Sequence, residues 1–229
     1  MNKLVKLSTT PTTGGWHVLR GDKPLHTPRG VNLLLPTEAL AEAIASEWRV
    51  LKGQPKLGEI PLTQFANTAA DHTATDRANA IEAFLSHAET DLLCYRAAHP
   101  AALVAKQAEG WGAVLEWLQQ THGAELMVYT GITPQPQPAS TLAKLRAVAE
   151  GLDDFRLTAL SFGAGLLGSA VLSLALLQGR LTTEETLKLT LLDEAFQAEQ
   201  WGELPEQTQR RESMAAEIKS LAGFISLLA

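Results

Sequence analysis

Apolar residues recur at steps of three and four over most of the chain, the spacing of helices that bury one face. The last four helices predicted by this spacing cover residues 140–152, 154–178, 182–201 and 206–228. The first third of the chain instead contains short runs in which apolar and polar residues alternate, as they do in strands. The pattern therefore predicts an α+β protein, with a small β-containing N-terminal domain and a larger all-helical domain after it.

Turn and cap residues set the expected domain limits. Trp16 and Val18 share one face of a predicted strand, which a Gly21-Asp22 turn closes. Thr37 is placed to cap the helix that follows, and a linker containing glycine and proline comes after that helix. These signals predict a β-rich domain with one helix at residues 1–57 and a helical domain at residues 58–229.

One apolar segment is long enough to raise the question of a membrane span. Residues 157–179 contain no charge over 23 positions, and about 20 apolar residues suffice to cross a bilayer. Polar residues and glycines interrupt the segment, however, and no basic cluster flanks it. Gly165, Ser169 and Ser173 form a stripe of small side chains that lets another helix approach closely. We therefore expect a buried central helix and no stable membrane insertion.

Composition narrows the class of protein. Hydrophobic residues make up 45% of the chain and charged residues 19%, as in a globular protein with a real core. The formal net charge of -6 argues against binding to nucleic acid, which usually requires a basic face. One cysteine cannot form an internal disulfide, and the first residues do not resemble a signal or transit peptide. These features predict a cytoplasmic protein of bacterial origin.

The only cysteine, Cys94, lies in the stretch TDLLCYRA. A nucleophilic cysteine needs a nearby base, cation or helix N-terminus that lowers its pKa. His87 and Asp91 could share a helical face with Cys94, as helpers of a nucleophile or as metal ligands, but no paired Cys or His motif accompanies them. Free cysteines are usually buried, so we expect an inert core thiol. A small cytoplasmic enzyme using Cys94 is the alternative.

Gly163, Gly165 and Gly168 match the GxGxxG string of dinucleotide sites. That string binds a nucleotide where it follows a strand and opens a helix, whereas here it lies inside a long apolar helical run. Helix packing accounts for the glycines better, and a nucleotide-binding regulator is kept as a second alternative. No spacing of Ser, His and acidic residues suggests a catalytic group, so we predict no catalytic residue, metal, cofactor or small-molecule substrate.

An acidic segment stands out near the end of the chain. Between Thr182 and Glu206 it carries seven acidic residues against a single lysine, Lys188. Most charges on helices belong to a solvated face, and from spacing alone that interpretation is favoured. The alternative is a docking surface for a basic or polar partner.

A family resemblance favours the docking surface over the solvated face. Seven stretches, together and in this order, resemble the ATP synthase F(1) assembly chaperones that attend the alpha subunit. The resemblance runs from about Trp16 to the end of the chain. The stretches are GWHVLRGDKPLHTP, LPTEALAEAIASEW, IPLTQFANT, TDLLCYRA, WGAVLEWL, LGSAVLSLALLQGRLTTEE and LDEAFQAEQWGE.

The resemblance implies a two-domain fold, no catalysis, and binding to the unassembled alpha subunit until beta subunits replace the chaperone. An orphan subunit exposes interfaces that would otherwise aggregate. On this basis we expect the stretch DLLCYR to be helical, with Cys94 packed in the helical bundle and Asp91 and Arg96 facing polar neighbours. We expect Trp48 to lie as a wedge between the two domains. The expected partner-binding residues lie on the acidic segment and are Asp193, Glu194, Glu199, Trp201 and Glu203.

Overall fold

The structure, a computed structural model, describes residues 6–229 except 52, 54, 56, 57, 132, 134 and 203. It has a small sheet region followed by many helices, which confirms the predicted α+β class. The chain divides into two compact units. The first contains the chain up to Asn79 together with Asp153–Ala159 and Gly223–Ala229, and the second contains Ala80–Leu152 and Leu160–Ala222. These units differ in extent from the domains predicted at residues 1–57 and 58–229, and that division stays a prediction.

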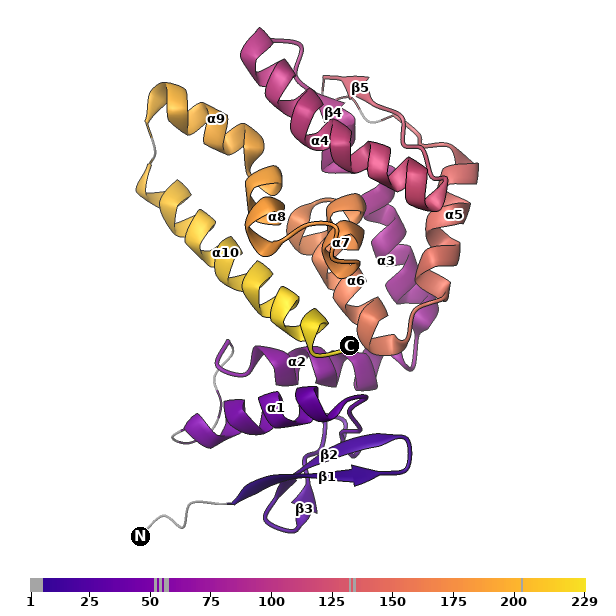
Figure 1. The fold of residues 1–229 in the computed structure, drawn as a ribbon, viewed down its shortest axis with the longest axis vertical. Coiled ribbons are helices and arrows are strands. Elements are labelled where there is room, and N and C mark those ends of the chain that lie inside the picture. The colour runs from indigo at the N-terminus through magenta and orange to yellow at the C-terminus, as the bar shows by residue number, and fades with distance from the viewer. Residues whose placement is uncertain are drawn as a thin grey trace. The chain divides into compact units, whose positions relative to one another are not determined.

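Three antiparallel strands in the order β1-β2-β3 form the sheet of the first unit (Figure 1). They are β1 (Leu7–Thr12), β2 (Gly15–Arg20) and β3 (Lys23–Pro24). Val18 on β2 is buried, and Gly21 adopts a positive φ of 67° in the turn that follows. The predicted strand and its Gly21-Asp22 turn are therefore confirmed.

Helices α1 (Glu38–Val50) and α2 (Pro61–Thr68) pack together in the same unit, and a π-helical turn, η1 (Ala69–Thr73), follows α2. Thr37 caps α1 as predicted, since its hydroxyl accepts a hydrogen bond from the Leu40 amide at 3.2 Å. The Glu47 carboxylate on α1 accepts hydrogen bonds from the Leu62 and Thr63 amides at 2.7 and 3.0 Å. Glu47 thereby satisfies the free N–H groups at the start of α2.

Residues from near the end of the chain complete this unit. The Thr37 hydroxyl donates a hydrogen bond to the Leu227 carbonyl at 2.5 Å. The rings of Phe65 and Phe224 lie with their centroids 5.0 Å apart, and Phe224 is fully buried. The first unit is thus assembled from segments that are far apart in the sequence.

Helices dominate the second unit (Figure 1). Two of the helices named here, α3 and α6, begin in the first unit. The elements in order are α3 (Arg77–Glu89), η2 (Leu92–Cys94), β4 (Tyr95–Arg96), α4 (Ala101–His122), β5 (Tyr129–Thr130), α5 (Ala139–Glu150), α6 (Asp154–Leu167), α7 (Ala170–Leu177), α8 (Thr183–Thr190), α9 (Leu192–Trp201) and α10 (Pro205–Ser226).

The apolar segment is two helices, so the prediction of a single helix over 154–178 was wrong. Gly168 adopts a left-handed φ of 62° that ends α6, and Ser169 then caps α7 by accepting a hydrogen bond from the Leu172 amide at 3.0 Å. Helix α7 is buried over Ala170–Leu176. No helix in the described part of the chain is long and apolar enough to cross a membrane.

The helix predicted over 182–201 is also interrupted. Thr182 and Glu185 form a reciprocal capping box at the start of α8. Leu191 lies between α8 and α9 with a φ of -102° and a ψ of 20°, outside the α-helical conformation. The indole Nε1 of Trp111 on α4 donates a hydrogen bond to the Leu189 carbonyl at 2.9 Å. A tertiary hydrogen bond therefore lies at the junction between α8 and α9.

The stretch DLLCYR does not form an α-helix, so that expectation was wrong, although Cys94 is buried as expected. Helix α3 ends at Glu89, a single 3₁₀ turn holds Leu92–Cys94, and Tyr95–Arg96 pairs in parallel with Tyr129–Thr130. Asp91 starts the 3₁₀ turn by accepting a hydrogen bond from the Leu93 amide at 3.0 Å. An aspartate favours such caps over a helix interior.

Candidate partner-binding surface

The acidic segment forms α8, α9 and the first residues of α10, and further acidic residues continue along the first half of α10 (Figure 1). We call residues 192–217 the α9–α10 arm. It contains seven acidic and two basic residues, a formal charge of -5, compared with -6 for the whole chain. Nearly all the net charge of the protein is thus concentrated in the arm.

Asp193 is half-buried and held by α4. Its Oδ1 accepts a hydrogen bond from Nε2 of Gln107 at 2.7 Å. Gln107 is itself buried, and its Oε1 accepts a hydrogen bond from the Ala97 amide at 2.9 Å. The Asp193 carboxylate therefore has an intramolecular partner and is not simply a solvated charge.

Arg96 extends this network beneath the arm. Its guanidinium lies 5.1 Å from the ring centroid of Trp111 and donates hydrogen bonds to the carbonyls of Leu93 and Gln107. Burial lowers the pKa of Arg96, and the nearby Asp193 carboxylate opposes that shift. The charge of Arg96 is therefore balanced locally, within the group of residues that holds Asp193.

The other acidic candidates on α9 make surface ion pairs. Glu194 pairs with Arg210 of α10 at 3.0 Å, and Glu199 pairs with Lys106 of α4 at 2.6 Å. Exposed pairs of this kind contribute about 0–1 kcal/mol to stability, so they can exchange for a partner's charges at little cost.

Trp201 is the most exposed of the large hydrophobic side chains in the described residues, at 80%. Leu204, on the other side of the α9–α10 connection, is 60% exposed. Glu203 lies between them and outside the described residues. The end of the arm thus presents two apolar side chains to solvent.

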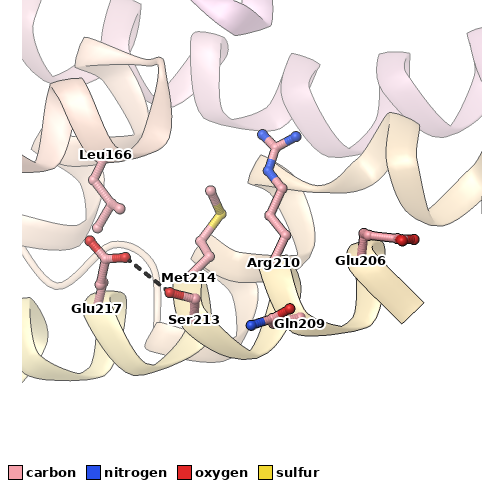
Figure 2. Close-up of a pocket in the computed structure, with 7 residues that line it drawn as sticks. All are labelled: Leu166, Glu206, Gln209, Arg210, Ser213, Met214 and Glu217. Carbon is pink, nitrogen blue, oxygen red and sulfur yellow. Dashed lines mark hydrogen bonds between the residues drawn. The ribbon is translucent and has the colours of Figure 1, made fainter. Parts of the chain in front are cut away.

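A pocket of about 400 Å³ lies between α6 and the first half of α10. Leu166 projects into it from α6, and Met214 and Arg210 project from the facing side of α10 (Figure 2). Ser213 and Glu217 are linked by a 3.4 Å hydrogen bond at its margin. Periodicity alone could not reveal this pocket, because Leu166 was expected to be part of a continuous buried helix.

Asp91 is fully buried in the second unit and serves the core. Its carboxylate accepts hydrogen bonds from the Ser169 hydroxyl at 2.8 Å and from the Val171 amide at 3.1 Å, besides the Leu93 amide. Burial raises the pKa of Asp91 to about 6, while these hydrogen bonds act in the opposite direction. This carboxylate joins η2 to the start of α7.

Cys94 is also fully buried. Burial, together with the nearby Asp91 carboxylate, raises the pKa of its thiol to about 12. A nucleophilic cysteine has the opposite shift, so the geometry disfavours the enzyme alternative. In the described part of the chain, no group of three His, Cys, Asp or Glu side chains could hold a metal ion.

The glycines of the GxGxxG string serve packing between helices. A Cβ added to Gly163 would lie 2.4 Å from Oγ of Ser173 on α7 and 3.0 Å from Cδ2 of Leu221 on α10. Gly168 supplies the left-handed end of α6. The string lies in and just after α6 and does not follow a strand. A dinucleotide-binding site requires a strand immediately before the string.

Trp48 belongs to α1 and joins it to α2 within the first unit. Its indole Nε1 donates to the Thr63 hydroxyl at 3.1 Å, and that hydroxyl donates in turn to Glu47 at 2.7 Å. Its expected role between domains stays a prediction.

Gln107 and Trp111 were absent from the residues selected by sequence. Both are buried on α4 and both reach the α8–α9 region. A glutamine four residues before a tryptophan on an apolar helix face does not by itself indicate a functional residue. Their importance becomes clear from their hydrogen bonds to Asp193 and Leu189.

Comparison with known proteins places this arrangement in a family. A model of the ATP12 chaperone protein family matches residues 2–119. The mitochondrial protein atp12 of Schizosaccharomyces pombe is 25% identical over 192 residues, which are 79% of this chain and 66% of that protein. The chain thus spans slightly less than two thirds of the length of that curated relative.

Solved structures extend the similarity over nearly the whole chain. The crystal structure of Atp12 from Paracoccus denitrificans is 38% identical, with a TM-score of 0.91 and coverage of 97% of this chain and 96% of that one. A point mutant of the same protein gives a TM-score of 0.92 at 38% identity, covering 97% and 95%. A protein from Agrobacterium tumefaciens is 34% identical, with a TM-score of 0.92 and coverage of 99% and 85%. The chain belongs to the ATP12 chaperone family.

Proposed function

We propose that the protein is an assembly chaperone that binds the unassembled alpha subunit of the F(1) sector of ATP synthase and prevents its aggregation before the hexamer forms. The observation that carries this proposal is the similarity to Paracoccus Atp12 over 97% of the chain at 38% identity. An isolated subunit of a ring exposes the surfaces that normally contact its neighbours, and such surfaces self-associate. A chaperone that covers them transiently solves this problem without chemistry.

The proposed partner-binding residues are those of the acidic segment: Asp193, Glu194, Glu199, Trp201 and Glu203. An exposed tryptophan gains much from desolvation at an interface, and tryptophan is enriched among residues that dominate binding. Surrounding carboxylates select partners with basic surfaces and speed their association.

The proposed role needs no catalytic residue, metal, cofactor or small-molecule substrate. It places the protein in the bacterial cytoplasm, where newly made alpha subunits would meet it. Trp48 is proposed to act structurally between the predicted domains, and Asp91 and Arg96 to support the second unit.

Co-expression tests the proposal. The alpha subunit of the host ATP synthase is produced with and without this protein, and its soluble fraction is measured. We expect the alpha subunit to become soluble and to co-purify with the protein in stoichiometric amounts, while the beta subunit does not. Equal solubility of the alpha subunit in both cases, with no co-purification, would contradict the proposal.

A charge-reversal variant tests the acidic residues. Glu194→Lys combined with Glu199→Lys should weaken capture of the alpha subunit while the melting temperature changes little, because both pairs are exposed. Glu89→Lys, an exposed acid at the end of α3, is the matched control. If both variants capture as well as the wild type, these carboxylates are merely solvated.

A further inference from the structure

The first half of α10 is a helix with no buried face. No side chain in residues 205–217 is buried, whereas Ile218, Leu221 and Phe224 in the second half are fully buried. A helix normally owes most of its stability to a packed apolar face. The first half of α10 lacks that support within the described residues.

Apolar side chains are nevertheless gathered beside this segment. Leu166 and Met214 are half-buried and line the pocket of about 400 Å³ between α6 and α10 (Figure 2). Phe162, one helical turn before Leu166, is 41% exposed. Trp201 and Leu204 add exposed apolar surface at the end of the arm. Such groupings on a soluble protein usually mark an interaction site.

Charge identifies the kind of partner. The arm has a formal charge of -5, and Glu206 and Glu217 border the pocket. Arg210 also lines the pocket, but its charge is paired with Glu194. A partner that buries apolar side chains here must also bring basic residues to its polar edge, because an acidic partner would be repelled.

The walls of the pocket indicate the secondary structure of the partner. Both α6 and α10 are helices whose backbone groups are used within the helix, so an extended strand would find no ladder to join. A helix needs no such ladder, because it binds through side chains spaced three and four residues apart. The pocket therefore suits an amphipathic helix.

We propose that the α6–α10 pocket, extended by Trp201 and Leu204, binds a basic amphipathic helix of the client protein. This inference rests on the proposed chaperone function for the existence of a client. The apolar face of the client helix packs on Leu166 and Met214, Trp201 covers one end, and its lysines or arginines lie along Glu206 and Glu217. Binding also gives the first half of α10 the packed face that it lacks.

Two synthetic peptides test the proposal with the full-length protein. One is an 18-residue helix of leucine and lysine with a single apolar face, and the other replaces every lysine by glutamate. Fluorescence anisotropy of the labelled peptides should show saturable binding of the lysine peptide alone, weakened by added salt because screening reduces charge attraction. Binding of both peptides with equal affinity, or of neither, would overturn the proposal.

Variants locate the binding. Trp201→Ala combined with Met214→Gln should weaken the lysine peptide by about tenfold or more, as for residues at the centre of an interface. Val128→Ser, which removes a side chain that is 46% exposed elsewhere in the second unit, is the control and should bind as the wild type does. Melting temperatures confirm that each variant is folded. Equal loss in the double variant and the control would also overturn the proposal.

The two proposals fail separately. If the wild type solubilises the alpha subunit and the double variant does so equally well, the chaperone function stands and the pocket is not its client site. If the lysine peptide binds at the pocket but the alpha subunit is not captured, the helix-binding site stands and the proposed client is wrong.

Discussion

Nε2 of Gln107 donates a hydrogen bond to Oδ1 of Asp193 at 2.7 Å, joining a buried amide of α4 to a half-buried carboxylate of α9. The amide is fixed in orientation, because its Oε1 accepts from the Ala97 backbone. Asp193 is therefore a candidate for partner contact and also holds α9 against α4. Measurements of binding and of stability have to separate these two roles.

Breaking this link should destabilise the second unit. Asp193→Ala leaves the buried Gln107 amide without its acceptor, and such a loss costs about 1–3 kcal/mol. Glu199→Ala, which removes an exposed ion pair, should change stability by about 1 kcal/mol or less. Urea denaturation measures both free energies of unfolding. Equal effects of the two substitutions would show that the Gln107–Asp193 hydrogen bond contributes no more to stability than an exposed ion pair does.

Two glycines in helices should respond to alanine in opposite ways. Gly163→Ala places a methyl group 2.4 Å from Oγ of Ser173, so we expect overpacking to cost about 1–3 kcal/mol. Gly112→Ala on α4 meets no atom within 4 Å and should stabilise by about 0.5–1 kcal/mol through helix propensity. Thermal melts of both variants check the prediction, and stabilisation by Gly163→Ala would contradict the close approach of α6 and α7.

Asp91 should make stability depend on pH in a defined direction. Burial raises its pKa from 3.8 to about 6, so between these values the folded state keeps a proton that the unfolded state has lost. The contribution of Asp91 to stability is then greatest below pH 4 and falls as the pH rises through 6, by about 3 kcal/mol in total.

Comparison with Asp91→Asn isolates this effect. The asparagine variant should be destabilised at every pH, because its NH₂ group cannot accept a hydrogen bond from the amide of Val171 or Leu93. The difference in unfolding free energy between wild type and variant should shrink as the pH rises from 4 to 7. A difference that grows over this range would mean that the hydrogen bonds outweigh burial and lower the pKa of Asp91.

Cys94 should be unreactive in the folded protein. Its thiol has a pKa of about 12 and is buried, so it offers almost no thiolate at pH 8. A thiol reagent should modify it only as fast as the protein unfolds, and at full speed in denaturant. Cys94→Ala should keep capture of the alpha subunit and cost about 1 kcal/mol, since little volume is lost. Loss of capture in a folded variant would restore the nucleophile hypothesis.

Local signals in the sequence were sufficient where a residue's neighbours in the chain determine its structure. Thr37 caps α1 and Gly21 turns the chain after β2 because both act within a few residues. Helix ends were harder, because periodicity continues across a break. Gly168 ends α6, and the end of α8 carries a hydrogen bond from Trp111, which is 78 residues away from Leu189 in the sequence.

The candidate surface was predictable in composition but not in its contacts. The acidic residues of the arm and the exposed Trp201 were identifiable from charge and from the family resemblance. The ties of Asp193 to Gln107 and of Glu194 to Arg210 were not, because each joins helices whose pairing the sequence does not specify. The pocket beside Met214 was not predictable for the same reason, because it depends on the packing of α6 against α10.

The first unit is built from three separate segments of the chain, and this affects the order in which it can fold during translation. Its sheet and α1 belong to the first 50 residues, yet the ring of Phe224 packs against that of Phe65 and the Leu227 carbonyl accepts a hydrogen bond from the Thr37 hydroxyl. A ribosome delivers residues 223–229 only after the whole second unit has been synthesised. The N-terminal sheet, α1 and α2 therefore emerge before the residues that Thr37 and Phe65 contact, and the first unit cannot be completed until the end of translation.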